Sequence, residues 1–173
     1  TRTMLTSSNG TSWTSTSWNC SDCRPDQDNS SSNQTYNFGL EDVTYGNSTF
    51  VAVGTSGTIL TSSDGTSWDN KSSGTSLSLI GVTYGNNKFL TLGISGSTRT
   101  MLTSSNGTSW TSTSWTCSAC QDPDNNSNQT YNFTLEDVTY GNSTFVAVGT
   151  SGTILTSSDG ISWDNKSSGT SLT

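Results

Sequence analysis

The chain has 173 residues and a net charge of −7, with three arginines and three lysines. This charge disfavours nucleic acid as a partner, because nucleic-acid binding depends on basic side chains that neutralise phosphate. Hydrophobic residues make up only 28% and charged residues 11%, while serine and threonine fill 67 positions, so the composition excludes a disordered polyelectrolyte and predicts a thin, aromatic-rich core. No apolar run approaches the roughly 20 residues of a membrane span, and we expect none.

The predicted elements begin with residues 1–18, TRTMLTSSNGTSWTSTSW, which contain two strands around an Asn-Gly turn. A polar insertion of about 16 residues follows, and then a module of four strands. Within that module we predict strands at 42–46, 49–54, 58–63 and 67–72, with the continuous apolar run 49–54 buried on both faces. The Asp64-Gly65 pair predicts a hairpin turn, because both positions tolerate positive φ.

The rest of the chain repeats these elements. Residues 40–77 recur at 135–172 with the single change of Thr66 to Ile161, and residues 1–18 recur unchanged at 98–115. The motif SSNGTSW or SSDGTSW, with one SSDGISW variant, occurs four times and marks four modules. We predict their boundaries at 1–39 (half a blade and an insertion), 40–78 (a blade), 79–134 (a blade and an insertion) and 135–173 (a blade). Four short strands in about 42 residues are typical of a β-propeller blade. We therefore predict an all-β fold of tandem four-stranded antiparallel blades, in a β-propeller or propeller-like array of two double modules of 95–97 residues.

The SSDGTSW motif resembles the Asp-box, a hairpin motif of sialidase-like propellers. The whole unit VTYGNSTFVAVGTSGTILTSSDGTSW is similar to the repeats of secreted proteins with sialidase-like or photosystem-assembly-factor-like propellers, and the resemblance covers nearly the whole chain outside the two insertions. It implies a structural role, in which the Asp and Ser side chains hold the turn and the Trp packs between strands. That role falls on Asn9, Trp13, Asp64, Trp68, Asn106, Trp110, Asp159 and Trp163. The motif departs from the family pattern by being one residue shorter and by carrying Asn in place of Asp at positions 9 and 106.

Each insertion holds one Cys-x-x-Cys pair, Cys20/Cys23 and Cys117/Cys120. We favour a local disulfide in each insertion, as expected of an extracellular chain. A zinc site shared by both pairs, a redox pair, and pairing between insertions or chains stay open, although the chain has no histidine for a mixed zinc site and no βαβ context for a redox motif. Five nearby aspartates, which match no calcium loop and read as a solvated acidic surface, are Asp22, Asp26, Asp28, Asp122 and Asp124.

The surface is predicted to be glycosylated. Twelve Asn-x-Ser/Thr sequons occur, and composition alone raises this number in a chain so rich in Asn, Ser and Thr. Asn9 and Asn106 belong to the turn motif, so we predict glycans on the others, first on Asn33, Asn47, Asn128 and Asn142, which we expect in exposed loops or hairpin tips, and then on Asn19, Asn29, Asn70, Asn125, Asn132 and Asn165. Such a coat implies a secreted or cell-surface protein.

No catalytic site stands out. The sialidase resemblance would require three arginines on the substrate carboxylate, but Arg2 and Arg99 occupy one repeated position and Arg24 lies in an insertion. Glu41 and Glu136 are also one repeated position, whereas catalytic residues are normally unique. The chain has no histidine, the commonest general base, and no carboxylate pair of the glycosidase kind is singled out. We predict that the protein is not an enzyme and uses no cofactor or metal.

Two kinds of function remain. Trp18, Tyr36, Trp115 and Tyr131 would serve a carbohydrate-binding module by stacking on sugars, although we favour a role in pinning their own insertions. The near-perfect duplication favours a structural protein of an extracellular, glycosylated filament, sheath or appendage. Residue 1 is not Met, and the first module lacks two strands of its blade, about 19 residues, which predicts a processed or excerpted chain. Its partners would be copies of itself or neighbouring repeats, through blade completion.

Overall fold

The computed structural model describes residues 3–7, 9–17, 19–21, 39–95, 98–113, 116–118 and 133–170. The described residues form β-strands joined by turns and a single 3-10 turn, Thr55–Gly57. The all-β prediction is therefore confirmed. No helix in the described part of the chain has the length and apolar character needed to cross a membrane.

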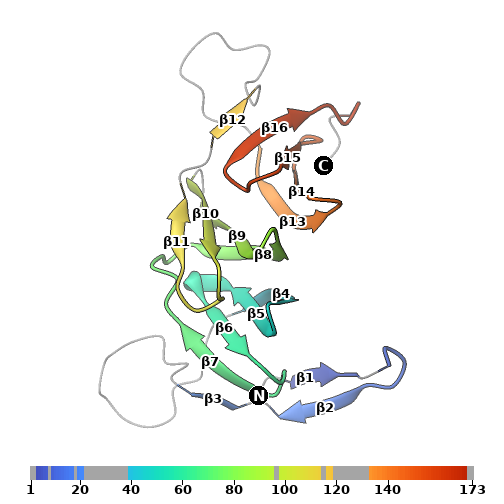
Figure 1. The fold of residues 1–173 in the computed structure, drawn as a ribbon, viewed down its shortest axis with the longest axis vertical. Helices are drawn as coiled ribbons and strands as arrows, with labels where there is room; N and C mark the ends of the chain where they lie inside the picture. The colour runs from blue at the N-terminus through green and yellow to red at the C-terminus, as the bar shows by residue number, and fades with distance from the viewer. Residues whose placement is uncertain are drawn as a thin grey trace.

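Three sheets contain a four-stranded antiparallel meander, as predicted for propeller blades (Figure 1). The first comprises β4 (Leu40–Gly46), β5 (Thr49–Gly54), β6 (Ile59–Ser62) and β7 (Ser67–Lys71). The second comprises β8 (Ser78–Gly85), β9 (Lys88–Ser95), β10 (Thr98–Ser104) and β11 (Thr111–Thr113). The third comprises β13 (Leu135–Gly141), β14 (Thr144–Gly149), β15 (Ile154–Ser157) and β16 (Ser162–Lys166). We call them blade A, blade B and blade C, and the two-stranded sheet of β1 (Thr3–Thr6) and β2 (Thr14–Ser17) the half-blade.

The turns explain why the strands end where they do. Between the first two strands of blade A, Asn47 and Ser48 have φ of 46° and 58°. Positive φ at both central residues is the type I′ turn, one of the two-residue hairpin turns whose twist matches that of the strands. Blades B and C have the same turn at Asn86-Asn87 and Asn142-Ser143. Asp64-Gly65 was predicted to form a hairpin turn because both positions tolerate positive φ. In the structure only Gly65 adopts a positive φ, of 75°.

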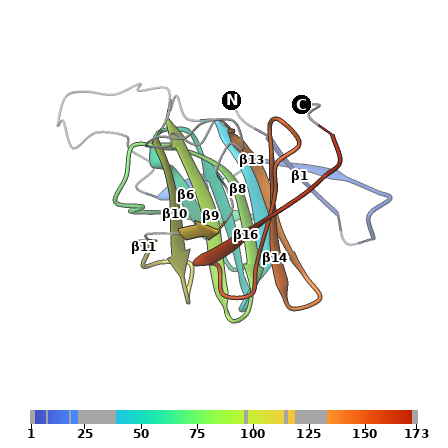
Figure 2. The ribbon, with the colours of Figure 1, turned by 90° about the horizontal axis from the view of Figure 1, so that it is seen from above.

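The blades are stacked along the long axis of the molecule in chain order (Figure 1). The first strand of each blade lies against that of the next, so that β4 contacts β8 and β8 contacts β13. Viewed along the stack, the strands of successive blades overlie one another, and the half-blade projects to one side (Figure 2). The array is open along this direction among the described residues.

The hydrophobic core lies between blades, and blade B contributes one face to the cluster on either side of it. Between blades A and B the buried residues are Val51, Val53, Ile59, Leu79, Val82, Phe89 and Leu102. Between blades B and C they are Leu90, Leu92, Met101, Phe133, Leu135, Val138, Phe145, Ala147, Leu155 and Trp163. A blade alone therefore leaves two apolar faces to be covered by its neighbours.

Two short strands at the start of the insertions were not predicted. β3 (Asn19–Ser21) pairs in parallel with β7, and β12 (Thr116–Ser118) pairs in parallel with β16. Each therefore extends the outer edge of the blade that follows it in the sequence. Added strands of this kind cover the unpaired backbone groups of an edge, which are otherwise prone to pair with other chains.

Candidate functional site: the turn motif and the blade faces

The serine and aspartate of the SSDG motif close its turn by hydrogen bonds. In blade A the backbone N–H groups of Thr66 and Ser67 both donate to Asp64 Oδ1 at 2.8 Å. The N–H of Gly65 donates to Ser62 Oγ at 2.8 Å, and the Ser62 hydroxyl donates to Asp64 Oδ1 at 3.1 Å. Blade C repeats this arrangement around Asp159, with distances of 2.8 Å from Ile161 and Ser162.

Asparagine holds the turn in the same way. The carboxamide oxygen of Asn106 accepts from the N–H groups of Thr108 and Ser109 at 2.9 and 3.0 Å. Asn9 accepts from Thr11 and Ser12 at 2.9 Å. The turn thus needs one acceptor oxygen at this position rather than a charge. The substitution at positions 9 and 106 that departs from the family pattern leaves the hydrogen-bonded turn intact.

The backbone donors also stabilise the charged form of the aspartates. The N–H groups of Ser162 and Ile161 lower the pKa of Asp159 from 3.8 to about 2. The same bonds from Ser67 and Thr66 hold the pKa of Asp64 well below its ordinary value. A carboxylate that accepts several backbone hydrogen bonds resists protonation, so these groups are suited to holding a turn and unsuited to donating a proton near neutral pH.

The tryptophan of the motif is an anchor only where a blade is complete. Trp68 and Trp163 are buried, and Trp68 Nε1 donates to the Gly65 carbonyl at 3.2 Å. Trp110 is half-buried and makes the same bond to Gly107 at 2.9 Å. Trp13, in the half-blade, is exposed. The four copies of one motif therefore differ in their surroundings and not in their turn geometry.

In blades B and C a tyrosine lies over a glycine of the preceding blade. A Cβ added at Gly46 would overlap the ring of Tyr84, and a Cβ at Gly85 would overlap the ring of Tyr140. Only glycine allows the backbone and the ring to approach this closely. The corresponding glycine of blade C, Gly141, has no atom within 4 Å of such a Cβ. The Tyr–Gly contact thus repeats at both blade junctions. Gly141, at the end of the stack, is not covered by a tyrosine among the described residues.

The glycine of the turn motif makes a second contact between blades. A Cβ at Gly107 would lie 2.9 Å from Val51 of blade A, and one at Gly160 would lie 2.7 Å from Leu90 of blade B. Both distances are too short for a real side chain, so these turns sit directly on the strand of the preceding blade. Gly65 has only Phe50, of its own blade, near the corresponding position, at 3.8 Å.

Polar contacts add to each junction. Asn47 Nδ2 donates to the Ser105 carbonyl at 3.4 Å between blades A and B. Between blades B and C, Asn86 Nδ2 donates to the Ser158 carbonyl at 3.3 Å and Lys88 Nζ to the Asp159 carbonyl at 3.0 Å. Blades A and C carry Thr49 and Thr144 at the position of Lys88. The lysine therefore gives the junction of blades B and C a polar contact that the other junction lacks among the described residues.

The outward faces of the stack expose residues that are buried inside it. Val148 of blade C is 42% exposed, whereas Val53 at the same position of blade A is 0% exposed. At the other end, Val43 of blade A is 55% exposed, whereas Val138 at the same position of blade C is 3% exposed. The predicted burial of 49–54 on both faces accordingly holds for the buried part of β5, Val51–Gly54, but not for the identical strand β14. Identical sequences differ in burial because only one of them has a neighbour on that side.

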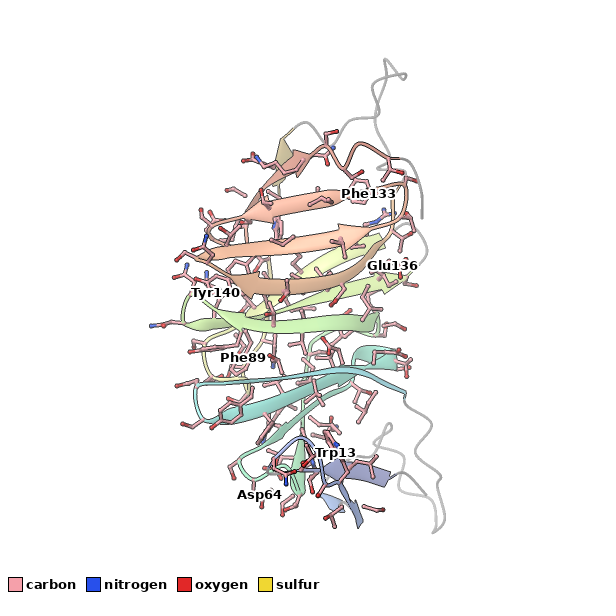
Figure 3. The ribbon with its side chains drawn as sticks, turned by 90° about the vertical axis from the view of Figure 1, so that its right-hand side faces the viewer. Trp13, Asp64, Phe89, Phe133, Glu136 and Tyr140 are labelled. Atoms are coloured by element: carbon pink, nitrogen blue, oxygen red, sulfur yellow. The ribbon has the colours of Figure 1, made fainter. Side chains whose placement is uncertain are left out.

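A cleft of about 540 Å³ separates the half-blade from blade A. Leu5 and Trp13 line it from the half-blade, and Val43, Phe50 and Trp68 line it from blade A. Figure 3 shows Trp13 and Asp64 at this same end of the molecule. The apolar residues that line the cleft have counterparts in blades B and C that pack against another blade.

The predicted site residues are partly visible. Asn47 and Asn142 lie in exposed hairpin turns, and Asn70 and Asn165 are exposed on β7 and β16. Cys20 and Cys117 lie in β3 and β12, opposite Trp68 and Trp163 in the strand register. Cys23 and Cys120 lie outside the described residues, so the disulfides remain predictions. Also outside are Trp18, Trp115, Tyr36, Tyr131, the five aspartates read as a solvated acidic surface, and the sequons at Asn29, Asn33, Asn125, Asn128 and Asn132.

The remaining candidates are scattered. Glu41 and Glu136 occupy the bulge positions at the start of β4 and β13 and are exposed. They lie in different blades, and Figure 3 shows Glu136 and Tyr140 at opposite ends of β13. Arg99 lies over the ring of Phe133, 5.5 Å from its centre, which is a contact between blades rather than part of a substrate pocket. The described residues contain no group of three or more side chains suited to hold a metal ion.

The surfaces through which the blades pack on one another were not predicted from the sequence. The repeated Tyr-Gly pairs at 45–46, 84–85 and 140–141 belong to these surfaces, but in the sequence they indicate only a strand that ends in a turn. Only the stacking of blades shows that the tyrosine of one pair covers the glycine of the previous one. The covered and uncovered copies are identical in sequence at positions 46 and 141, so no local pattern separates them.

These features define a β-propeller-type protein, built of four-stranded antiparallel blades that pack face to face. The chain is similar to the solved structure of YCF48 from Cyanidioschyzon merolae, with 21% identity and a TM-score of 0.55 over 74% of this chain and 37% of that one. It is also similar to a structure of YCF48 bound to D1 peptide, with 17% identity and a TM-score of 0.53 over 73% and 38% of the two chains. The chain thus spans little more than a third of these proteins, and the likeness shows the propeller fold. No protein-family model matches the sequence, and neither does any curated protein.

Proposed function

We propose that the protein is a structural β-blade repeat of an extracellular, glycosylated filament, sheath or appendage, in which modules continue one another face to face. The observation that carries this proposal is the pair of apolar outer faces, where Val43 and Val148 are exposed although their counterparts are buried within the stack. Contiguous exposed apolar surface marks sites of association. Copies of the chain or neighbouring repeats are the partners that these faces fit best, because the counterparts of both residues, Val138 and Val53, each pack against another blade inside the molecule.

The use of the polar groups supports a scaffold rather than an enzyme. Asp64 lines the cleft, but its carboxylate accepts two backbone hydrogen bonds. Asp42 also lines the cleft, and it accepts from the N–H groups of Val43 at 2.7 Å and Val82 at 2.8 Å. Both carboxylates are therefore engaged in holding backbone groups of the blades. We infer that the Asp-box-like motif has the purely structural role implied by its family resemblance.

The surface supports an extracellular setting. Six of the sequon asparagines lie in the described residues with exposed positions: Asn9, Asn47, Asn70, Asn106, Asn142 and Asn165. Asn9 and Asn106 use their carboxamide oxygen in the turn, which leaves the other four as the glycan sites that we propose first. Local disulfides at Cys20/Cys23 and Cys117/Cys120 would suit the same oxidising environment.

Electron microscopy and sedimentation of native material test the proposal. We expect glycan-decorated filaments with an axial repeat of two blades, and a mass of the chain that falls on deglycosylation. Discrete monomers with saturable sugar binding would contradict it.

A secreted carbohydrate-binding propeller is the alternative, favoured by the exposed Trp13 beside the cleft, since an aromatic face is suited to stack on a sugar ring. A glycan array tests it: specific binding that is lost in Trp13→Ala and retained in Trp110→Phe would establish the alternative. A sialidase-like hydrolase is a remote third possibility, and it would show itself by release of sialic acid from a reporter substrate.

A further inference from the structure

The half-blade has an edge that its counterpart in blade B does not leave open. β1 pairs with β2, and among the described strands it has no other neighbour. The equivalent strand β10 pairs with β11 on one side and with β9 on the other. The exposure of the side chains follows this difference: Leu5 of β1 is 60% exposed and Leu102 of β10 is 1% exposed.

The cleft beside this edge has the walls of an occupied blade junction. Phe50, Ala52 and Trp68 line it. Their counterparts in blade C are Phe145, Ala147 and Trp163, which are buried in the cluster that contains Leu90 and Leu92 of β9. The same wall therefore receives a strand of β9 type at blade C and faces a cleft of about 540 Å³ at blade A.

We propose that this cleft is a docking site for a two-stranded β-hairpin with the sequence of β8–β9, residues 78–95, contributed by a neighbouring module. The hairpin would extend the β1–β2 sheet by β-augmentation, in which backbone hydrogen bonds give affinity and side-chain pockets give specificity. This inference rests on the proposed structural function and names the partner of one face. The contacts between blades B and C serve as the template for those that the docked hairpin would make with blade A.

The apolar contacts of the docked hairpin follow from that template. Its glycine at the position of Gly85 receives the ring of Tyr45, as Gly85 receives Tyr140. Its leucine at the position of Leu90 meets Gly65, as Leu90 meets Gly160. Tyr45 is exposed in the structure, and Gly65 has no residue of a preceding blade near its added Cβ, so both positions are open to these contacts.

Polar contacts select this hairpin over the other hairpin of the repeat. Lys88 and Asn86 donate to the carbonyl oxygens of Asp159 and Ser158 at the template junction. The counterparts of those carbonyls beside the cleft belong to Asp64 and Ser63. The β4–β5 hairpin, residues 40–54, carries Thr49 where β9 has Lys88. It also carries valine at the two leucine positions, so it would fill the cleft less well and make one polar contact fewer.

A synthetic peptide of residues 78–95 added to the full chain tests the proposal. We expect saturable binding with a blue shift of tryptophan fluorescence from Trp13, and a weaker response to the matched peptide of residues 40–54. Leu5→Lys and Val43→Lys should each weaken binding about tenfold or more, because a lysine ammonium would have to be buried in the apolar junction. The matched control is Val148→Lys, on the exposed face of blade C, which should leave binding unchanged. Binding lost in Val148→Lys but kept in Val43→Lys would overturn the proposal.

A second variant guards against a peptide that does not fold on its own. Residues 78–97 are placed directly before Thr1, as they stand before Thr98 in the chain. We expect the amides of β1 and β4 to become protected from hydrogen exchange, and the same extension carrying lysine at the positions of Leu90 and Leu92 to give no protection. Unprotected β1 amides in both extended chains would refute the docking site.

The two proposals fail separately. Hairpin binding by a chain whose native material is monomeric would refute the structural function and leave the docking site standing. Filaments that assemble normally from Leu5→Lys chains would support the structural function and overturn the docking site.

Discussion

The repeat offers a matched pair of glycines that tests the packing between blades. Gly46 and Gly141 occupy the same position of two modules that are identical over residues 40–65 and 135–160. A methyl group at Gly46 would overlap the Tyr84 ring, whereas one at Gly141 would have no atom within 4 Å. Neither glycine has a positive φ, so alanine is compatible with the backbone at both positions. The two Gly→Ala variants therefore differ in the presence of the neighbouring blade alone.

The expected magnitudes have opposite signs. Gly141→Ala should raise the free energy of unfolding by about 0.4–1 kcal/mol, because alanine reduces the conformational entropy of the unfolded chain. Gly46→Ala makes the same gain but forces the Tyr84 ring away, and overpacking of this kind costs about 1–3 kcal/mol. A difference between the variants of about 2 kcal/mol corresponds to roughly 4–8 °C in Tm for a chain of this size.

Urea denaturation and thermal unfolding of the purified chain measure this difference. We expect Gly46→Ala to unfold first and to regain stability when Tyr84→Ala is combined with it, because the smaller side chain removes the overlap. Equal stabilities of Gly46→Ala and Gly141→Ala would refute the inference that a tyrosine of one blade packs on the glycine of another.

Three further predictions concern the turn motif and the junctions. The depressed pKa values of Asp64 and Asp159 mean that their contribution to stability is present above pH 4 and is lost as the pH falls toward about 2, so the double variant with Asn at both positions should show a flatter acid unfolding profile. Asn47 donates to the Ser105 carbonyl of the next blade, whereas Asn142 makes no such contact among the described residues, so glycopeptide mapping, with Thr66 and Ile161 distinguishing the two copies, should find higher occupancy at Asn142. Lys88→Met should lower the free energy of unfolding by about 1 kcal/mol in urea titrations, through loss of the bond to the Asp159 carbonyl, and an unchanged midpoint would argue against that bond.

The strands could be predicted because their limits are set locally. The apolar run 49–54 follows Asn47 and Ser48, which have positive φ, and precedes the positive-φ residues Ser56 and Gly57. The structure places β5 at Thr49–Gly54, between these two turns. The turn motif is also local, since Asp64 bonds only to residues within three positions of it. Short-range chemistry of this kind is written directly in the sequence.

The surfaces could not be predicted for the opposite reason. Val53 and Val148 have identical neighbours in sequence and differ in exposure because a blade covers only one of them. The parallel pairing of β3 with β7 was missed as well, because its residues, Asn19–Ser21, are polar and show no strand periodicity. Contacts between modules depend on which module stands next, and a repeated pattern carries no information about its own neighbours.

The order of the modules nevertheless has a physical basis, which lies in the first strand of each blade. The N–H of Val138 bonds to its preceding residue, Asp137, at 2.7 Å. In blade B the preceding residue is Gly81, and the N–H of Val82 is satisfied instead by the second carboxylate oxygen of Asp42 in blade A, at 2.8 Å. Gly81 is in turn confined by blade C, because a Cβ there would lie 3.0 Å from Asp137 Oδ1.

Blades A and C carry an aspartate before the valine of their first strand, and blade B carries a glycine there. These aspartate-bearing and glycine-bearing blades therefore complement each other. Two glycine-bearing blades in succession would leave a valine N–H without its carboxylate, and an unsatisfied buried donor costs about 1–3 kcal/mol. Two aspartate-bearing blades in succession would bring two carboxylates close together. The valine N–H beside them would be no free donor, because in such a blade it already bonds to the aspartate of its own strand. Alternation avoids both costs, which explains why the long period of the sequence spans two modules. It also explains why the hairpin that we place beside blade A, whose first strand carries Asp42, is of the glycine-bearing β8–β9 type.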